Sequence, residues 1–468
     1  MGAVVSHSGR WRPPAPEPRV RPLGPIALIG ALWKNPLEAW THAHFEQPMV
    51  TANLAIGQAT VVNAPADVRR VLLDNVANYQ KDTLQRRMMS AALNNGLLMA
   101  EGEQWRAQRR ALAPMFARRT VISFAPAMVQ AAASLVDRWH RHEDGAVRDV
   151  AADVTLLTLD VLERTIFSEG LGGDPHEVRA AMRRYFDIIG RIEPFDLLGL
   201  PDFVPRVGRI KARPALLFFD RAVDTIIATR RRRLAQDPSN VPDDILTLLL
   251  KAQDPETGQA MSEAEVRANI ITFIAAGHET TANTISWSLF LLSQSAHWQE
   301  RVVAEAEREI GGAVDGLAER LVETRAVIEE AIRLYPPLAA ISRSAVAADE
   351  LSGCRIKAGS MVVIAPYVLH RHRLLWERPD EFDPTRFLGR ARADIDRFAY
   401  LPFGVGPRIC IGSGFALQEA TLVVATVMKH FRFEPVPGRR VWPVLRVTLR
   451  PEGGLPMVVR RRRNSANG

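Results

Sequence analysis

The stretch at residues 403–412 reads FGVGPRICIG and places three glycines and one proline around a single cysteine. This composition predicts a tight loop whose backbone can approach a flat ligand closely. Apolar residues at helical spacing follow from Ala416 to Val427, so Cys410 comes just before the N-terminus of a helix. The unpaired N–H groups and the dipole of that helix, together with Arg408, favour a thiolate over a thiol. A thiolate in this position can ligate iron.

The composition of the 468 residues is that of an ordinary globular protein, with 47% hydrophobic and 24% charged residues. The net charge is +8, but the arginines are scattered apart from short runs at 230–233 and 460–463, so we expect no nucleic-acid binding. The two cysteines, Cys354 and Cys410, exclude a disulfide framework and favour a reducing, cytoplasmic location. We expect a cytoplasmic monomer.

The chain shows no internal repeat and no Gly/Ser linker, which favours one domain at residues 41–460. We expect a weakly structured Pro- and Arg-rich segment at 1–40 and a basic tail at 461–468. The apolar piece from Pro25 to Trp33 is shorter than the roughly 20 residues that span a bilayer, so we expect no membrane anchor.

Hydrophobic periodicity predicts a fold that is mainly α with small β-sheets. Short strand-like runs are found at 59–63, 341–347, 361–365 and 455–460. Amphipathic helical patterns cover residues 104–141, 149–168, 176–190, 214–236 and 262–296. The last of these begins with a capping box of Ser262 and Glu265, and it is apolar around much of its circumference, so it should cross the interior.

The centre of that long helix reads AGHETT at residues 276–281, an unusual choice for a buried helix. Thr280 can hydrogen-bond to the carbonyl of Ala276 and loosen the helix there, with the carboxylate of Glu279 next to it. A hydroxyl group that receives protons from a neighbouring carboxyl group can pass them into a pocket without admitting bulk water. Glu279 and Thr280 are therefore the candidate catalytic residues.

Two further pairs lie on single helical faces. Glu330 and Arg333, three residues apart among apolar neighbours, predict a partly buried ion pair with a structural role. Trp105 and Arg109, four residues apart, share another face, where the arginine can bind a carboxylate through two hydrogen bonds.

Together these segments resemble the signatures of the cytochrome P-450 family. The cysteine loop is similar to F-x-x-G-x-R-x-C-x-G, the helix centre to A-G-x-[DE]-T-T, and the two pairs to E-x-x-R and W-x-x-x-R. The segment at 382–387, FDPTRF, resembles the family's F-x-P-x-R-F and supplies Arg386. The motifs extend from residue 105 to 412 in the family's order, and no fixed position departs from the pattern.

The resemblance implies the family's fold, a triangular prism of helices in which haem b lies between the long helix and the helix after the cysteine. It implies that Cys410 is the axial ligand of the haem iron. It also implies that Glu330, Arg333 and Arg386 form a charge network that braces the cysteine loop. The residues implied to bind the cofactor are Trp105, Arg109, Arg343, Phe403, Arg408, Cys410 and Gly412.

The activity implied is monooxygenation with O2, in which one oxygen atom enters a C–H bond of the substrate. Electrons would come from a ferredoxin or flavodoxin with its NAD(P)H-dependent reductase. Such donors are usually acidic and would suit a basic face formed by arginines 106, 110, 118 and 119.

The family's arrangement places Ala276, Leu338 and Ile341 in the substrate pocket, within the segments 84–99, 183–200, 270–276 and 338–341. These segments are largely aliphatic, so we expect an apolar substrate such as a terpenoid, a fatty acid or a steroid-like compound. A peroxide-driven haem-thiolate enzyme and a non-catalytic haem sensor or binding protein are the alternatives. Neither needs the acid–alcohol pair of Glu279 and Thr280, and its presence argues against both.

Overall fold

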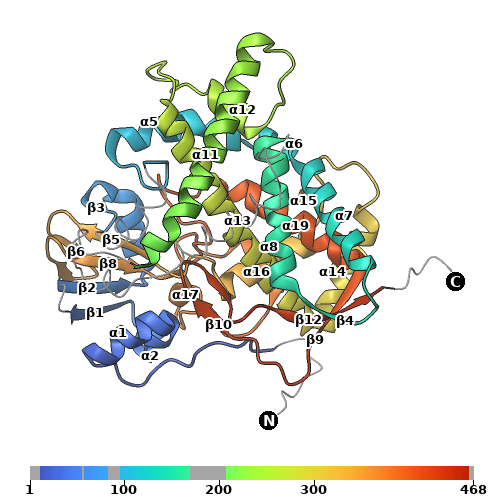
Figure 1. The fold of residues 1–468 in the computed structure, drawn as a ribbon. Coiled ribbons are helices and arrows are strands. Elements are labelled where there is room, and N and C mark those ends of the chain that lie inside the picture. Colours follow the sequence, from blue (N-terminus) through green and yellow to red (C-terminus); the bar gives the residue numbers. More distant parts are fainter. Residues whose placement is uncertain (1–10, 55–56, 83–94, 169–206, 463–468) are drawn as a thin grey trace. The chain divides into compact units, whose positions relative to one another are not determined.

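The computed structural model describes residues 11–54, 57–82, 95–168 and 207–462. The chain divides into two compact units, each made of separate stretches of sequence. The first contains residues 1–83, 128–155 and 280–468, and the second contains 84–127 and 156–279. Both are mainly helical, and the sheets are small, which confirms the predicted fold class (Figure 1).

The helices of the first unit surround α19, which follows the cysteine loop. Helix α19 packs against α14, α15 and α16. In the core of this unit, Trp287 and Tyr335 stack with their ring centroids 3.9 Å apart, and both are fully buried. The helices that lie wholly in this unit are α1 (Pro25–Lys34), η1 (Pro36–Ala39), α2 (His42–Glu46), α3 (Pro65–Arg69), η2 (Arg70–Asp74), η3 (Val76–Asn78), α14 (Ala296–Glu309), α15 (Leu317–Arg320), α16 (Val322–Leu334), α17 (Pro366–Leu369), η6 (Pro384–Phe387), α18 (Gly389–Ala393) and α19 (Ser413–His430).

The largest sheet of the first unit has five strands in the order β1-β2-β8-β5-β3. They are β1 (Met49–Leu54), β2 (Gly57–Val62), β8 (Met361–Ile364), β5 (Ile341–Ala345) and β3 (Tyr79–Gln80). All neighbours are antiparallel except β2 and β8, in which Thr60 lies opposite Val362. The core against this sheet includes Leu72 and Leu401, so the segment leading into the cysteine loop is anchored in it.

Three smaller sheets complete the first unit. The first joins β4 (Ala146–Asp149), β12 (Pro456–Arg461) and β9 (Phe431–Pro435), with β12 in the middle. The second pairs β10 (Pro443–Leu445) with β11 (Leu449–Pro451). The third is a hairpin of β6 (Asp349–Leu351) and β7 (Cys354–Ile356), and it carries Cys354.

The named elements in the described part of the second unit are all helices. It contains α5 (Gly102–Leu112), η4 (Ala113–Phe116), α6 (Arg118–Ser123), the π-helical turn η5 (Glu163–Phe167), α11 (Val207–Gln236) and α12 (Ile245–Lys251). The buried Arg230 holds three of these segments together. It pairs with Asp244 at 2.6 Å and donates to the Thr247 hydroxyl and the Phe167 carbonyl.

Three long helices continue from one unit into the other: α7 (Ala125–His140), α8 (Val150–Leu162) and α13 (Glu263–Ser293). The capping box expected at the start of α13 is present. The Ser262 N–H donates to the Glu265 carboxylate at 3.0 Å, and the Glu265 N–H donates to the Ser262 hydroxyl at 3.3 Å. The expected helix at 262–296 is therefore confirmed to within three residues at its end.

Other expectations differ from the structure. The pattern at 104–141 forms α5, η4, α6 and α7, because Pro114 starts a 3-10 turn and Ala117 is extended. The segment expected to be weakly structured contains α1, and the Pro14 carbonyl accepts a hydrogen bond from the Tyr335 hydroxyl at 2.8 Å. The expected helix at 176–190 lies outside the described residues.

One described helical stretch, Arg118–His140, has the length and hydropathy of a membrane span. Of its most apolar window, 44% is buried within the protein. The core helix of a globular protein meets the same test, so this stretch is weak evidence for a membrane span.

Candidate active site

The cysteine loop of the first unit is held by its own backbone. The Cys410 N–H donates to the Phe403 carbonyl at 2.9 Å, and the Gly404 N–H donates to the Leu401 carbonyl at 3.3 Å. Gly412 is the N-cap of α19 and makes no side-chain cap bond. The thiol of Cys410 is exposed. Cys410 therefore lies two residues before the N-cap of the helix, with its main chain fixed and its side chain exposed.

Two glycines give the loop its shape. Gly404 and Gly406 have φ of 73° and 77°, which lie in the left-handed region. A Cβ at position 406 would also come within 2.0 Å of the Leu72 carbonyl oxygen, whereas one at position 404 would only touch Ile341 at 4.0 Å. Gly406 is thus required both by its dihedral angle and by the close approach of another main chain.

Strand β5 and the residues before it carry three of the predicted residues, of which Ile341 contacts the cysteine loop. Ile341 is half-buried and lies beside Gly404. Leu338, just before the strand, is 50% exposed. Arg343 is half-buried, and its Nη1 donates to the Ser342 carbonyl at 2.7 Å. Arg408, within the loop, is also half-buried. The first unit therefore contains all four of these candidates, and Ile341 is the one that lies against the cysteine loop.

The structure brings Glu330, Arg333 and Arg386 together. Arg333 donates to both carboxylate oxygens of Glu330, at 2.6 and 2.8 Å, and Arg386 lies 3.7 Å from the same carboxylate. Arg333 also donates to the carbonyls of His370, Pro379 and Glu381. Burial lowers the pKa of Arg386, partly offset by the charge of Glu330. The network thus holds the main chain between residues 370 and 383.

A residue that no motif singled out connects this network to the cysteine loop. The fully buried His370 accepts a hydrogen bond at Nε2 from the Leu401 N–H, at 2.8 Å. The only hint in the sequence is a histidine directly after the apolar run at 361–369. Its bonding partner is 31 residues away, so sequence patterns could not reveal the contact.

The middle of α13 is more open than the turns on either side. Ala276 is exposed, and Glu279 and Thr280 are half-buried, whereas residues 270–274 and 281–292 are buried. The Thr284 hydroxyl donates to the Thr280 carbonyl at 2.9 Å. Burial lowers the pKa of His278, in the same turn, to about 4. The helix thus exposes an acid and an alcohol next to a histidine that stays neutral.

The second unit carries Trp105 and Arg109 on one face of α5, both half-buried. The basic face expected nearby is partly neutralised, because Arg106 pairs with Glu103 at 3.1 Å and Arg110 pairs with Asp254 at 2.7 Å. Arginines 118 and 119 are exposed. Residues 84–94 of the pocket-lining segment expected at 84–99, and the whole segment expected at 183–200, lie outside the described residues.

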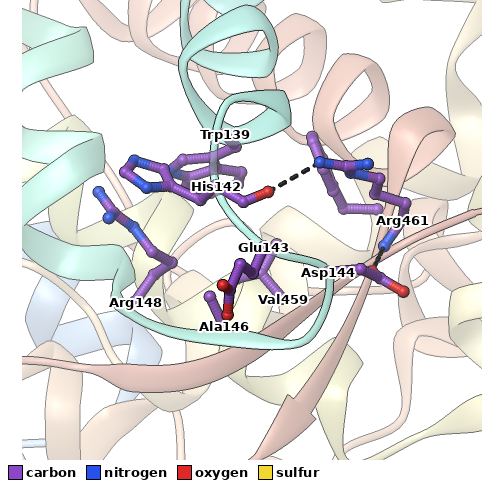
Figure 2. Close-up of a pocket in the computed structure, with 9 residues that line it drawn as sticks. Trp139, His142, Glu143, Asp144, Ala146, Arg148, Val459 and Arg461 are labelled. Atoms are coloured by element: carbon purple, nitrogen blue, oxygen red, sulfur yellow. Dashed lines mark hydrogen bonds between the residues drawn. The ribbon is translucent and has the colours of Figure 1, made fainter.

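A hollow in the first unit contains none of the predicted site residues. It lies between the end of α7 and the β4-β12-β9 sheet and is lined by Trp139, His142, Arg148 and Arg461, among others (Figure 2). Arg461 donates to the His142 carbonyl at 2.7 Å, and its own N–H donates to Asp144 at 2.6 Å. These polar groups tie the strand to the end of the helix, so we assign the hollow no catalytic role.

The fold and the cysteine loop define a class of haem-thiolate proteins, and residues 13–456 match the family model of cytochrome P-450. The chain belongs to this family. It is a cytochrome P-450 monooxygenase that binds haem b through a cysteine thiolate.

Two bacterial relatives and one solved structure are similar over nearly the whole chain. Cyclooctat-9-en-7-ol 5-monooxygenase of Streptomyces melanosporofaciens is 33% identical, over 89% of each chain. Cyclooctatin synthase of the same organism is 32% identical, over 90% of each chain. The crystal structure of the cytochrome P-450DA heme domain aligns with a TM-score of 0.82 and 25% identity, over 97% of this chain and 98% of that one.

The residues of the first unit fit the haem group. An exposed thiol next to a helix N-terminus is the donor that iron requires, and the loop needs glycine where it passes the Leu72 carbonyl. Arg343 and Arg408 are half-buried arginines, the residue type that binds carboxylates such as propionates. The donor set and the loop geometry are thus those of a haem-thiolate centre.

Proposed function

We propose that Cys410 is the cysteine that ligates the haem iron and that the enzyme hydroxylates an apolar small molecule. The cysteine loop carries this proposal, because Cys410 precedes α19 and its N–H is fixed by the Phe403 carbonyl. Cys354, the other cysteine, lies at the start of β7 in a two-stranded hairpin. A helix terminus that stabilises a thiolate supports Cys410 as the ligand.

Bound haem supplies an iron that activates O2, and thiolate ligation promotes cleavage of the O–O bond. The side chains of the protein would orient the haem and place positive charge near its propionates. Arg343 and Arg408 would bind propionates, and the family resemblance implies the same role for Trp105 and Arg109. Arginine suits this role because its planar guanidinium forms two parallel hydrogen bonds with a carboxylate.

Proton delivery is the role that we propose for Glu279 and Thr280. Both are half-buried in a helix whose neighbouring turns are buried, so each can reach solvent or a bound molecule. The Thr280 hydroxyl would pass a proton into the pocket and recover one from the Glu279 carboxyl group. Positioned proton transfer of this kind typically contributes about 10²–10⁴ in rate.

The substrate that we propose is apolar: a terpenoid, a fatty acid or a steroid-like compound. Ala276, Leu338 and Ile341 offer no hydrogen-bonding side chain, so a ligand held by them would be recognised through apolar contact. The name of the 33% identical relative describes oxidation of cyclooctat-9-en-7-ol, a cyclic alkenol, and supports this class.

For the electron supply we propose a separate ferredoxin or flavodoxin with its NAD(P)H-dependent reductase, acting on a cytoplasmic monomer. Arginines 118 and 119 are exposed and suit an acidic donor. Arg106 and Arg110 pair with carboxylates, which reduces the positive charge that these two arginines would present to an acidic donor.

The test combines binding and product analysis on the haem-loaded enzyme. A panel of terpenoids, fatty acids and steroids is screened for spin-state shifts. The binders are then incubated with a ferredoxin, its reductase, NAD(P)H and isotopically labelled O2. We expect one labelled oxygen atom per product molecule. Product that forms only when peroxide replaces NAD(P)H would contradict the proposal and favour a peroxygenase, and absence of product under both conditions would favour a haem-binding protein.

A further inference from the structure

Four hydrogen bonds of the first unit connect the buried ion pair with the cysteine loop. Arg333, which is paired with Glu330, donates to the His370 carbonyl at 2.8 Å. The His370 ring then accepts from the Leu401 N–H at 2.8 Å. Leu401 and Phe403 in turn accept the N–H groups of Gly404 and Cys410. Successive hydrogen bonds share a residue, first His370 and then Leu401. The last bond begins at Phe403, two residues after Leu401 in the chain.

The ring of His370 is held rigidly at the centre of this path. It is fully buried and packs against Tyr400, with the ring centroids 5.1 Å apart, and against Trp376 at 6.5 Å. Tyr400 is itself fixed, because its hydroxyl donates to the Glu329 carbonyl at 2.9 Å. This packing fixes the orientation of the His370 ring. It therefore also fixes the position of Nε2, the atom that accepts the hydrogen bond from the Leu401 N–H.

The protonation state of the ring suits an acceptor. Burial, with the charges of Arg333 and Arg371, lowers the pKa of His370 well below its ordinary value of 6.5. The imidazole is therefore neutral, and because Nε2 accepts a hydrogen bond, the ring proton is on Nδ1. Protonation of Nε2 would set two donors against each other and break the link.

We propose that His370 is a positioning residue for the thiolate ligand: its Nε2 fixes the backbone of Leu401 and thereby the start of the loop that holds Cys410. The inference rests on the proposed ligation of the haem iron by Cys410. It also connects the charge network to the cysteine loop. The network makes hydrogen bonds to the main chain of residues 370, 379, 381 and 383, and the ring of His370 bonds to the main chain of residue 401.

The test uses three variants of the full-length haem-loaded protein. His370→Phe keeps an aromatic ring against Tyr400 but removes the acceptor, and His370→Gln restores an acceptor of similar reach. His372→Phe is the matched control, because His372 is also buried and its Nε2 bonds to the Gln47 carbonyl, away from the cysteine loop. The measurements are the thiolate-ligated fraction in the spectrum of the reduced carbon monoxide complex and the reduction potential of the iron.

We expect His370→Phe to lower the ratio of thiolate-ligated to thiol-ligated haem roughly tenfold, because the buried Leu401 N–H would lose its hydrogen-bond partner. The reduction potential of the iron should also shift. His370→Gln should recover most of the wild-type ratio. His372→Phe should lower thermal stability and leave both readouts unchanged. A wild-type ratio and potential in His370→Phe, or an equal loss in His372→Phe, would overturn the inference.

Two further measurements distinguish failure of the inference about His370 from misfolding of the variant and from failure of the ligand proposal. If His370→Phe does not fold, hydrogen exchange of the wild-type holoenzyme decides: slow exchange of the Leu401 amide supports the link, and fast exchange overturns it. If Cys410→Ser retains the thiolate spectrum, the ligand proposal itself is wrong, whatever His370→Phe shows.

Discussion

Arg333 donates Nε and Nη2 to the two carboxylate oxygens of Glu330, at 2.6 and 2.8 Å, and both side chains are 0% exposed. Removal of one partner from such a pair leaves an uncompensated buried charge. We expect Glu330→Ala to reduce the free energy of unfolding by about 3–5 kcal/mol, measured by urea titration. The exposed pair of Arg390 and Asp394 is the control, and Asp394→Ala should cost less than about 1 kcal/mol. Equal losses in the two variants would contradict the structural role of Glu330.

Gly404 and Gly406 of the cysteine loop both have left-handed backbone conformations, but only Gly406 lies against another main chain. Comparing alanine variants of the two therefore distinguishes backbone strain from steric overlap. Gly404→Ala would add only a van der Waals contact with Ile341 at 4.0 Å and should cost about 1–2 kcal/mol of strain. Gly406→Ala adds an overlap with the Leu72 carbonyl, so its cost should reach about 2–5 kcal/mol. Urea titration gives the two free energies. Gly406→Ala should also lose haem during gel filtration, and equal stability of the two variants would exclude the close approach at Leu72.

The proposed proton relay makes Thr280→Ala an uncoupling variant. Without the hydroxyl, electrons are diverted from product to peroxide, and product formation should fall about tenfold or more while NAD(P)H consumption continues. Thr284→Ala, which removes the hydroxyl one turn further along α13, is the control and should keep wild-type coupling. The measurement is product and peroxide formed per NAD(P)H consumed. Unchanged coupling in Thr280→Ala would disprove the relay.

Burial of His278 predicts a pH dependence of stability. Its pKa is lowered from 6.5 to about 4 in the folded state, so the unfolded chain binds more protons between these values. The stabilisation is complete above pH 6.5 and is lost as the pH falls toward 4, by about 3 kcal/mol in total. His278→Gln should flatten the dependence of unfolding free energy on pH in this window. The same slope in variant and wild type would show that His278 is not the titrating group.

The sequence predicted local structure best where a side chain acts on its own helix. The capping box of Ser262 and Glu265 located the start of α13, because both partners lie within one turn. The break at Pro114 was missed, because the apolar periodicity continues through it while the backbone cannot. Strand β1 (Met49–Leu54) was missed as well, since its position depends on pairing with β2.

For the site, the motifs identified the residues that the structure places in the cysteine loop and the charge network. They did not reveal which glycine is indispensable, since that depends on the Leu72 carbonyl, more than 300 residues away in sequence. His370 was missed for the same reason, because its bond to the Leu401 N–H exists only in the folded chain. Contacts between segments distant in sequence are thus the part that patterns leave open.

The central claim is that Cys410 is the thiolate ligand of the haem iron, and the chain offers its own control because Cys354 is the only other cysteine. The most direct test is the spectrum of the reduced carbon monoxide complex in Cys410→Ser and Cys354→Ser. The account predicts that Cys354→Ser keeps the thiolate band of the wild type and that Cys410→Ser loses it. A thiolate band that survives in Cys410→Ser, or disappears in Cys354→Ser, would contradict the account.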